Sequence, residues 1–259
     1  MNRIKDYEVL KHNIVRWLKD YYWMHSGNIK AFVVGVSGGI DSAVVSTLCA
    51  KTGLPTYVVA MPLNSTHQNT RLSDLHTKQL AEKYENVTRV EVELSSVYES
   101  LLHSINWWSE AQQFDKKEFT SDELSNANTK SRIRMVTLYQ IAGAKKGIVV
   151  GTGNKIEDYG IGFYTKYGDG GVDIAPIADL YKTEVRELGG HLGVDALIID
   201  AKPTDGLWED GRTDEDQIGA TYEELEEAME NGEGKGVDIL YKFNNQNSHK
   251  MQPIPTFKL

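Results

Sequence analysis

Cysteine is almost absent from this sequence of 259 residues. The single cysteine, Cys49, has no partner within the chain, so an intramolecular disulfide is excluded. The seven histidines do not cluster with Cys49 at metal-ligand spacing. The sequence therefore excludes both a disulfide scaffold and a structural zinc site built on cysteine.

Long apolar runs and an excess of basic residues are also missing. No segment approaches the roughly 18 apolar residues of a membrane span, and the charged, amphipathic N-terminal segment is unlike a signal peptide. Lys and Arg total 28 against 37 for Asp and Glu, a formal net charge of −9. This balance argues against a protein that coats nucleic acid. We expect a cytoplasmic protein with neither a nucleic acid nor a membrane as its partner.

Short apolar runs alternate with helical patterns along the first 150 residues. Strands are predicted at 31–36, 56–61, 87–94 and 147–150, and helices at 4–24, 41–51, 66–84 and 126–146. This alternation indicates an α/β fold, a Rossmann-like doubly wound parallel sheet with helices on both faces. No internal repeat or linker interrupts the chain, so we expect one domain over residues 1–259.

The second half of the chain departs from this alternation. Residues 151–176 are rich in Gly, Asp and Tyr, and a helix is predicted over about 182–192. The polar stretch 202–216 fits a mobile active-site flap and a plain surface loop equally well. The acidic helix 222–230 is interpreted as a solvated face.

Residues 35–42, with the sequence GVSGGIDS, join the first predicted strand to a helix. A helix N-terminus offers unpaired backbone N–H groups to an anion, and glycines let a phosphate approach the backbone. The loop has no lysine where GxxxxGK[ST] would place one, and GxGxxG is absent. Asp41 would repel phosphate unless a divalent cation lies between them. We therefore infer Mg²⁺ shared by Asp41 and the phosphates.

Two other interpretations of this loop stay open. Asp41 or Ser42 could simply cap the helix. The string GVSGG also matches the nucleophile elbow G-x-S-x-G, with Ser37 as the nucleophile and Asp173 and His249 following in the hydrolase order. An elbow normally follows several strands, however, and the Asp41 carboxylate would oppose a developing oxyanion.

The string SGGIDS at 37–42 resembles the pyrophosphate-binding loop of the ATP pyrophosphatases, which form amides or thiolate substrates with release of AMP and PPi. GMP synthetase, asparagine synthetase and tRNA-modifying ligases are similar at this loop. Later strings resemble the NAD synthetase family in order and spacing, from about residue 30 to the end: NTKSRIRM (128–135), GTGNKIE (151–157), FYTKYGDGGVDIAP (163–176), LYKTEV (180–185), PT (203–204) and HK (249–250).

The resemblance implies an adenine nucleotide α-hydrolase-like fold and a ligase that converts nicotinate adenine dinucleotide (deamido-NAD), ATP and ammonia into NAD, AMP and PPi. In that reaction the carboxylate attacks the α-phosphorus of ATP, PPi leaves, and ammonia displaces AMP from the acyl adenylate. The protein would supply orientation and charge neutralisation. The resemblance also implies a homodimer with the dinucleotide near the interface.

Site residues follow by match to the family's motifs. The resemblance implies that Asp41 and Glu157 ligate Mg²⁺ and that, with Lys182, they are the catalytic residues. It implies an ATP site made of Gly35, Val36, Ser37, Gly38, Gly39, Ile40, Asp41, Ser42, Thr152, Lys182 and Thr204. It implies a deamido-NAD site made of Arg132, Lys166, Asp173, His249 and Lys250, in which Arg132 could serve the neighbouring subunit. The turn 168–171 is expected to provide shape, because glycines supply φ > 0.

Two departures from the family pattern are visible. Many members have an Arg and a Gln near the adenylate, where residues 60–68 read AMPLNSTHQ here. Neither Ala60 nor Met61 supplies that cation, and Gln68 is only a loose match. One extra residue also separates Glu157 from Lys166, which leaves the register of 158–161 open.

The nitrogen source is predicted from the space that the motifs occupy. Glutamine-dependent members carry an additional amidase domain with a catalytic cysteine, whereas the synthetase motifs already fill these 259 residues. Cys49 lies on the apolar side of a predicted helix, where a small buried hydrophobe is expected. We expect free ammonia as the substrate unless a separate amidase subunit delivers it. A serine hydrolase using Ser37 and a non-catalytic nucleotide-binding module are the competing hypotheses.

Overall fold

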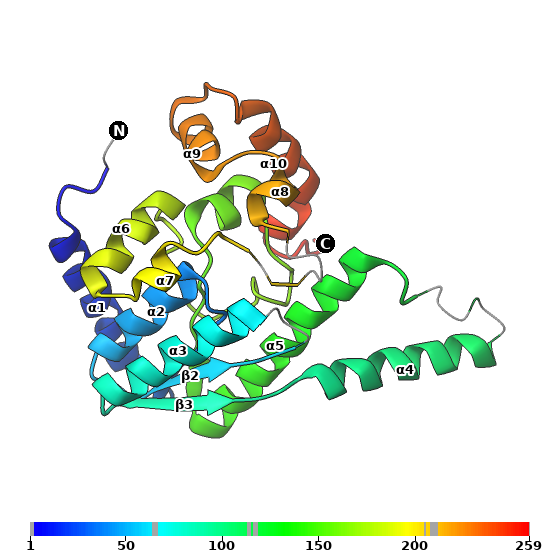
Figure 1. Cartoon of the computed structure of the whole chain (residues 1–259), viewed down its shortest axis with the longest axis horizontal. Helices are drawn as coiled ribbons and strands as arrows, with labels where there is room; N and C mark the ends of the chain where they lie inside the picture. Colours follow the sequence, from blue (N-terminus) through cyan, green and yellow to red (C-terminus); the bar gives the residue numbers. More distant parts are fainter. Residues whose placement is uncertain are drawn as a thin grey trace.

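Four parallel strands form one sheet in the order β3-β2-β1-β4 (Figure 1). The computed structural model describes residues 3–63, 67–112, 115, 119–204, 206–207 and 212–258, and of residues 67–69 only the backbone. The strands are β1 (Ala31–Gly35), β2 (Thr56–Ala60), β3 (Val87–Glu91) and β4 (Gly147–Val149). The chain leaves β1 toward β2 on one side and returns to β4 on the other. The crevice between the carboxyl ends of β1 and β4 is therefore the expected ligand position.

The alternation of side chains in β1 determines which helices cover each face. Phe32 and Val34 pack into the core shared with α1 (Tyr7–Met24), α2 (Ile40–Lys51), α6 (Lys182–Leu192) and α7 (Ala196–Ile199). Val33 points the other way, onto Met135 and Leu138 of α5 (Glu123–Lys145). The helix α3 (His67–Lys83) packs on the same face as α2, through Leu80. With α5 on the opposite face, helices cover both faces of the sheet, as predicted.

A further group of helices lies above the carboxyl ends of the strands (Figure 1). It comprises the π-helix η1 (Ile156–Ile161), α8 (Asp214–Ile218), α9 (Tyr222–Asn231) and α10 (Val237–Met251). These elements share a small core around Tyr222. On the opposite side of the molecule, α4 (Ser95–Ala111) projects beyond the sheet, beside α5. None of the described helices combines the length and apolar character of a membrane span.

Several predicted elements need correction. The strand expected at 87–94 ends at Glu91, although the N–H groups of Val92 and Leu94 still donate to the carbonyls of Ala60 and Pro62. Helices α4, α7, α8 and α10 and the π-helix were not predicted. The π-helix spans residues 156–161, within the stretch whose register the sequence left open.

The acidic helix expected as a solvated face is only partly one. In α9, Tyr222, Leu225 and Ala228 are buried. Glu226 accepts hydrogen bonds from the Thr183 N–H (3.1 Å) and the Thr183 hydroxyl (2.6 Å), so this carboxylate satisfies the first turn of α6. The acidic pattern of 222–230 does not reveal that α6 begins beside Glu226, because that contact depends on the tertiary fold.

Candidate functional site

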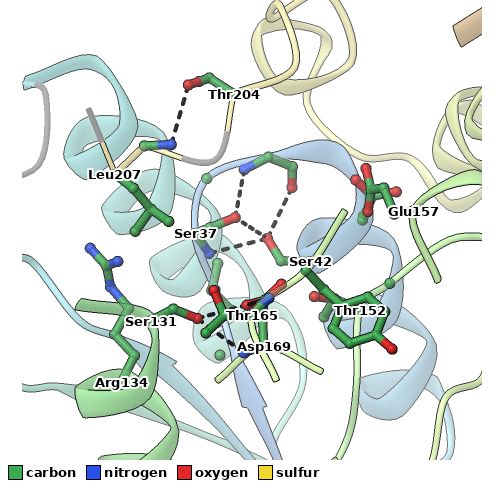
Figure 2. A pocket seen from close by; sticks show the side chains of 18 of the residues that line it. Ser37, Ser42, Ser131, Arg134, Thr152, Glu157, Thr165, Asp169, Thr204 and Leu207 are labelled. Atoms are coloured by element: carbon green, nitrogen blue, oxygen red, sulfur yellow. Dashed lines mark hydrogen bonds between the residues drawn. The ribbon is translucent and has the colours of Figure 1, made fainter. Parts of the chain in front are cut away.

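Hydrogen bonds of two serine hydroxyl groups fix the conformation of the loop between β1 and α2. The Ser37 and Ser42 hydroxyls lie 3.1 Å apart, and Ser42 Oγ also accepts from the Ser37 N–H and donates to the Gly39 carbonyl (Figure 2). Gly38 adopts φ +93°, which a residue with a side chain rarely tolerates. The first turn of α2 therefore presents its N–H groups to the cavity, in the arrangement that binds phosphate.

Asp41, Glu157 and Lys182 converge beside this loop, although they are far apart in the sequence. Lys182 Nζ donates to Asp41 Oδ2 at 2.5 Å and to Glu157 Oε1 at 3.0 Å. Asn154 is fully buried and links the Asp41 carboxylate to the backbone of Glu157. Its amide donates to Asp41 Oδ1 (3.3 Å), and its carbonyl oxygen accepts from the Glu157 N–H (3.2 Å).

The charge on Lys182 is stabilised by these carboxylates. Burial alone would lower the pKa of this side chain, which is 4% exposed, but Asp41 and Glu157 outweigh burial and hold its pKa above the ordinary value. The ammonium group therefore stays charged over the physiological range. Asp158 follows Glu157 in the chain. Its burial, and to a smaller extent the charges of Glu157, Asp169 and Asp41, raise the pKa of Asp158 to about 7.

The cavity above the strand ends has a volume of about 1240 Å³. Among the residues that line it are 35–42, Thr152, Glu157, Lys182, Thr204 and Lys250. Residues 201–204, 206 and 207 border its far side, where the Gly206 N–H donates to the Thr204 hydroxyl (Figure 2) and Lys130 Nζ donates to the Leu207 carbonyl. The described part of 202–216 contributes six residues to the cavity (202, 203, 204, 206, 207 and 214), which favours an active-site segment over a plain surface loop. The volume exceeds the roughly 300–1,000 Å³ of a typical small-molecule pocket, as a site for a large ligand requires.

Four of the five residues expected to hold deamido-NAD do not line this cavity in the described chain. Arg132 Nε donates to the Lys166 carbonyl, and the Asp173 carboxylate accepts from the Val149 N–H and the Tyr139 hydroxyl. His249 is exposed on α10. Lys250 is the one of the five that lines the cavity, and its Nζ donates to the Tyr164 carbonyl.

The turn 168–171 has the predicted role of providing shape but for another reason. The positive φ lies at Tyr167 (66°), whereas the glycines of the turn permit close approach. A Cβ on Gly168 would lie 2.3 Å from Ser131 Oγ, and one on Gly170 would lie 2.3 Å from the Tyr164 ring. Asp169 Oδ1 accepts from the Ser131 hydroxyl (2.7 Å), which joins the turn to α5 (Figure 2).

The sequence reasoning missed several residues of the site. Arg134 lines the cavity, and its Nε donates to the carbonyl of Met61, so a cation does stand at the end of β2 although it comes from α5. Arg134 lies within a string already identified, but only the fold brings it to β2. Tyr222 was missed as well, since its string carried no recognised motif. The side chain of Gln68 lies outside the described residues.

Neither alternative interpretation of the loop fits its contacts. The N-cap residue of α2 is Gly39, while the Asp41 carboxylate bonds to Lys182 and Asn154. The partners of the Ser37 hydroxyl are Ser42 and the Gly39 N–H, and Asp173 and His249 lie away from it. The contacts therefore support neither a helix cap at Asp41 nor a hydrolase triad.

Comparisons with known proteins show one family. The family model described as NAD synthase matches residues 10–254. An NH(3)-dependent NAD(+) synthetase of Finegoldia magna is 35% identical over 255 residues, which is 98% of this chain and 97% of that protein. The NMN synthetase of Francisella tularensis superposes with a TM-score of 0.86 at 33% identity and covers 99% of this chain and 100% of its own. The NH3-dependent NAD synthetase of Campylobacter jejuni, with bound nitrate, gives a TM-score of 0.73 at 24% identity, over 98% and 100% of the two chains.

Proposed function

The chain belongs to the NAD synthase family, and we propose how its cavity performs the ATP-dependent amidation of deamido-NAD by ammonia to NAD. The convergence of Asp41, Glu157 and Lys182 beside the glycine loop carries the proposal. Residues 35–42 bind the ATP phosphates, and Thr152 and Thr204 contact the nucleotide from opposite sides of the cavity. We place the enzyme in the cytoplasm.

Asp41 and Glu157 suit Mg²⁺ that is held jointly with substrate. Both carboxylates bond to the same Lys182 ammonium, so their oxygens lie within reach of one cation. No group of three or more acidic, His or Cys side chains in the described residues could hold a metal without help. Two carboxylates completed by phosphate oxygens and water are the usual ligands of Mg²⁺. When bound, the ion would neutralise the charge of departing PPi.

Lys182 changes partners in this proposal. Without ATP its charge balances the two carboxylates. With MgATP, the metal would take over that charge and leave the ammonium group to bind a phosphate. The substrate carboxylate then attacks the α-phosphorus, PPi leaves, and ammonia attacks the acyl carbon. The products are the amide, AMP and one proton.

We further propose a homodimer in which the deamido-NAD site is completed across the interface. Arg132, Val136 and Tyr139 lie on one face of α5, at helical spacing, with Val136 70% exposed. Lys166 and Asp173 meet this face through Arg132 and Tyr139. Three of the four expected dinucleotide residues outside the cavity thus gather around an exposed apolar strip, the feature that a second copy would cover. His249 stays a proposed ligand of the dinucleotide.

The mononucleotide is the second candidate substrate. The likeness to a protein named NMN synthetase extends over both whole chains, with a TM-score of 0.86 and 33% identity. A nicotinate mononucleotide presents the same carboxylate for adenylation and lacks the adenylate half. It would need fewer of the contacts that lie outside the cavity.

One assay separates these substrates. We would measure amide formation from deamido-NAD or from nicotinate mononucleotide with ATP, Mg²⁺ and ammonium, and replace ammonium by glutamine in parallel. NAD with an equal amount of AMP and PPi from ammonium alone is the expected result. A kcat/KM that is at least about tenfold higher for the mononucleotide would establish the second candidate. If neither acceptor led to amide formation and PPi release, both candidate substrates would be wrong.

A further inference from the structure

Tyr222 lies beside the cluster of Asp41, Glu157 and Lys182 and has no assigned role. The residue is fully buried, and its ring packs with Ile156, Leu225 and their neighbours in the core of the helices above the strand ends. An apolar core of this kind would accept phenylalanine equally well. The hydroxyl therefore needs an explanation beyond packing, because a buried hydroxyl is costly unless it is hydrogen-bonded.

The hydroxyl and the ring of Tyr222 both contact the cluster. The hydroxyl lies 2.7 Å from Glu157 Oε1 and 3.1 Å from Asp214 Oδ2. Lys182 Nζ stands 4.8 Å from the ring centroid, within the range of a cation–π contact. One side chain thus touches two of the three residues that converge beside the glycine loop.

A phenol has a single proton, and here two carboxyl groups face it. The shorter distance directs that proton to Glu157 Oε1, the oxygen that also accepts from Lys182 at 3.0 Å. Glu157 stands on the π-helix and Tyr222 on α9, so this hydrogen bond ties the Glu157 carboxylate to a second element.

We infer that Tyr222 is a positioning residue for the reaction: its hydroxyl holds the Glu157 carboxylate and its ring seats Lys182, so that both groups are preorganised for MgATP. The inference rests on the proposed role of Glu157 in metal binding. Partners of metal ligands orient them, and their removal typically weakens metal affinity by about 10- to 100-fold. Asp214 lies on the other side of the hydroxyl, and its N–H donates to the Pro203 carbonyl of the segment that borders the cavity.

The test measures metal binding directly. Mn²⁺ titrations followed by electron paramagnetic resonance, with a non-hydrolysable ATP analogue present, would compare the wild type with Tyr222→Phe. We expect the dissociation constant for Mn²⁺ to rise about tenfold or more, and the KM for Mg²⁺ to rise with it. The KM for the nicotinate substrate should stay within about twofold. Tyr241→Phe is the matched control, since Tyr241 is 60% exposed on α10, and it should behave as the wild type.

A second pair of variants separates loss of the bond to Glu157 from destabilisation caused by leaving the Asp214 carboxylate without the phenol. Tyr222→Phe removes the phenol from the Asp214 carboxylate, so the pair Asp214→Asn and Asp214→Asn/Tyr222→Phe repeats the comparison with that charge neutralised. The same rise in the dissociation constant in this pair supports the inference. Equal Mn²⁺ affinity within the pair, or weakening by Asp214→Asn as large as that by Tyr222→Phe, overturns it.

Glu157→Gln separates this inference from the proposed function. If that variant binds Mn²⁺ as the wild type does, the metal role of Glu157 itself is wrong. If Glu157→Gln loses affinity while Tyr222→Phe keeps it, the metal role stands and the positioning role of Tyr222 fails.

Discussion

At the scale of single residues, the bond between Lys182 and Asp41 determines what a substitution at the loop does. Asp41→Asn removes a carboxylate from the proposed metal site but keeps an oxygen that can accept from Lys182, and Glu157 still balances the buried ammonium charge. We expect kcat to fall by about 100-fold or more, with a small change in Tm. Turnover assays and thermal unfolding would check this. Asp179→Asn, an exposed carboxylate paired with Lys155, is the control, and unaltered turnover in Asp41→Asn would refute the metal assignment.

A second prediction at this scale concerns His76, which lies between α2 and α3. The Ser46 hydroxyl lies 3.0 Å from its Nε2, and burial lowers the pKa of His76 to about 4. Between pH 6.5 and 4 the unfolded chain therefore binds a proton that the folded chain does not. Stability must fall as the pH drops through this window.

His76→Gln isolates this contribution, because glutamine can still hydrogen-bond but does not titrate. The loss of unfolding free energy from pH 7 to pH 5 should be about 2 kcal/mol smaller in the variant than in the wild type. Urea unfolding at the two pH values measures it. Equal losses in both proteins would show that His76 is protonated in the folded state.

At the scale of elements, α6 must lie close to α2 because it carries Lys182 to Asp41. Gly189 permits this contact, since a Cβ there would lie 2.7 Å from Ile40 Cδ1 and 3.4 Å from Val44 Cγ2. Gly189→Ala should push the helices apart, lower Tm and reduce kcat by displacing Lys182 from the loop. Thermal unfolding and turnover measure the two effects.

The adjacent glycine provides the control. Gly190 is exposed in the same helix, and a Cβ there would meet nothing within 4 Å. Gly190→Ala should stabilise the protein by up to about 1 kcal/mol, because alanine favours the helix, and should leave kcat unchanged. If both alanine variants behaved alike, the close approach of α2 and α6 would not constrain the site.

At the scale of the whole molecule, the exposed strip of α5 predicts the oligomeric state. Light scattering should give twice the chain mass of 29.0 kDa. Val136→Glu would place a charge in the proposed interface and should yield monomers with strongly reduced activity, because the site would lose residues from the neighbouring copy. Trp23→Glu, at an exposed position of α1 (60%), should remain dimeric. A fully active Val136→Glu monomer would contradict completion of the site between subunits.

The strands and most helices of the α/β core could be predicted because their signals are local. The runs 31–36 and 56–61 and the helix at 182–192 have the periodicity that burial on one or both faces imposes. The patterns of α4 and α10 are about as amphipathic as that of α1, so these two helices were predictable and were missed. The π-helix spans six residues and α8 five, too few for a periodicity to show. The single domain over 1–259 and the residues for deamido-NAD stay predictions.

The sequence by itself determined the chemistry of this protein. The glycine loop with Asp41, the strings around Glu157 and Lys182 and their order along the chain identify an ATP-dependent ligase of one family. Only the tertiary structure decided which side chains contact one another. The contacts of Lys182 with Glu157, Tyr222 with Glu157 and Arg134 with Met61 join elements that are far apart in the chain. Local patterns record the periodicity of each element. They do not record the distance between side chains on different elements, and electrostatics and hydrogen bonding depend on that distance.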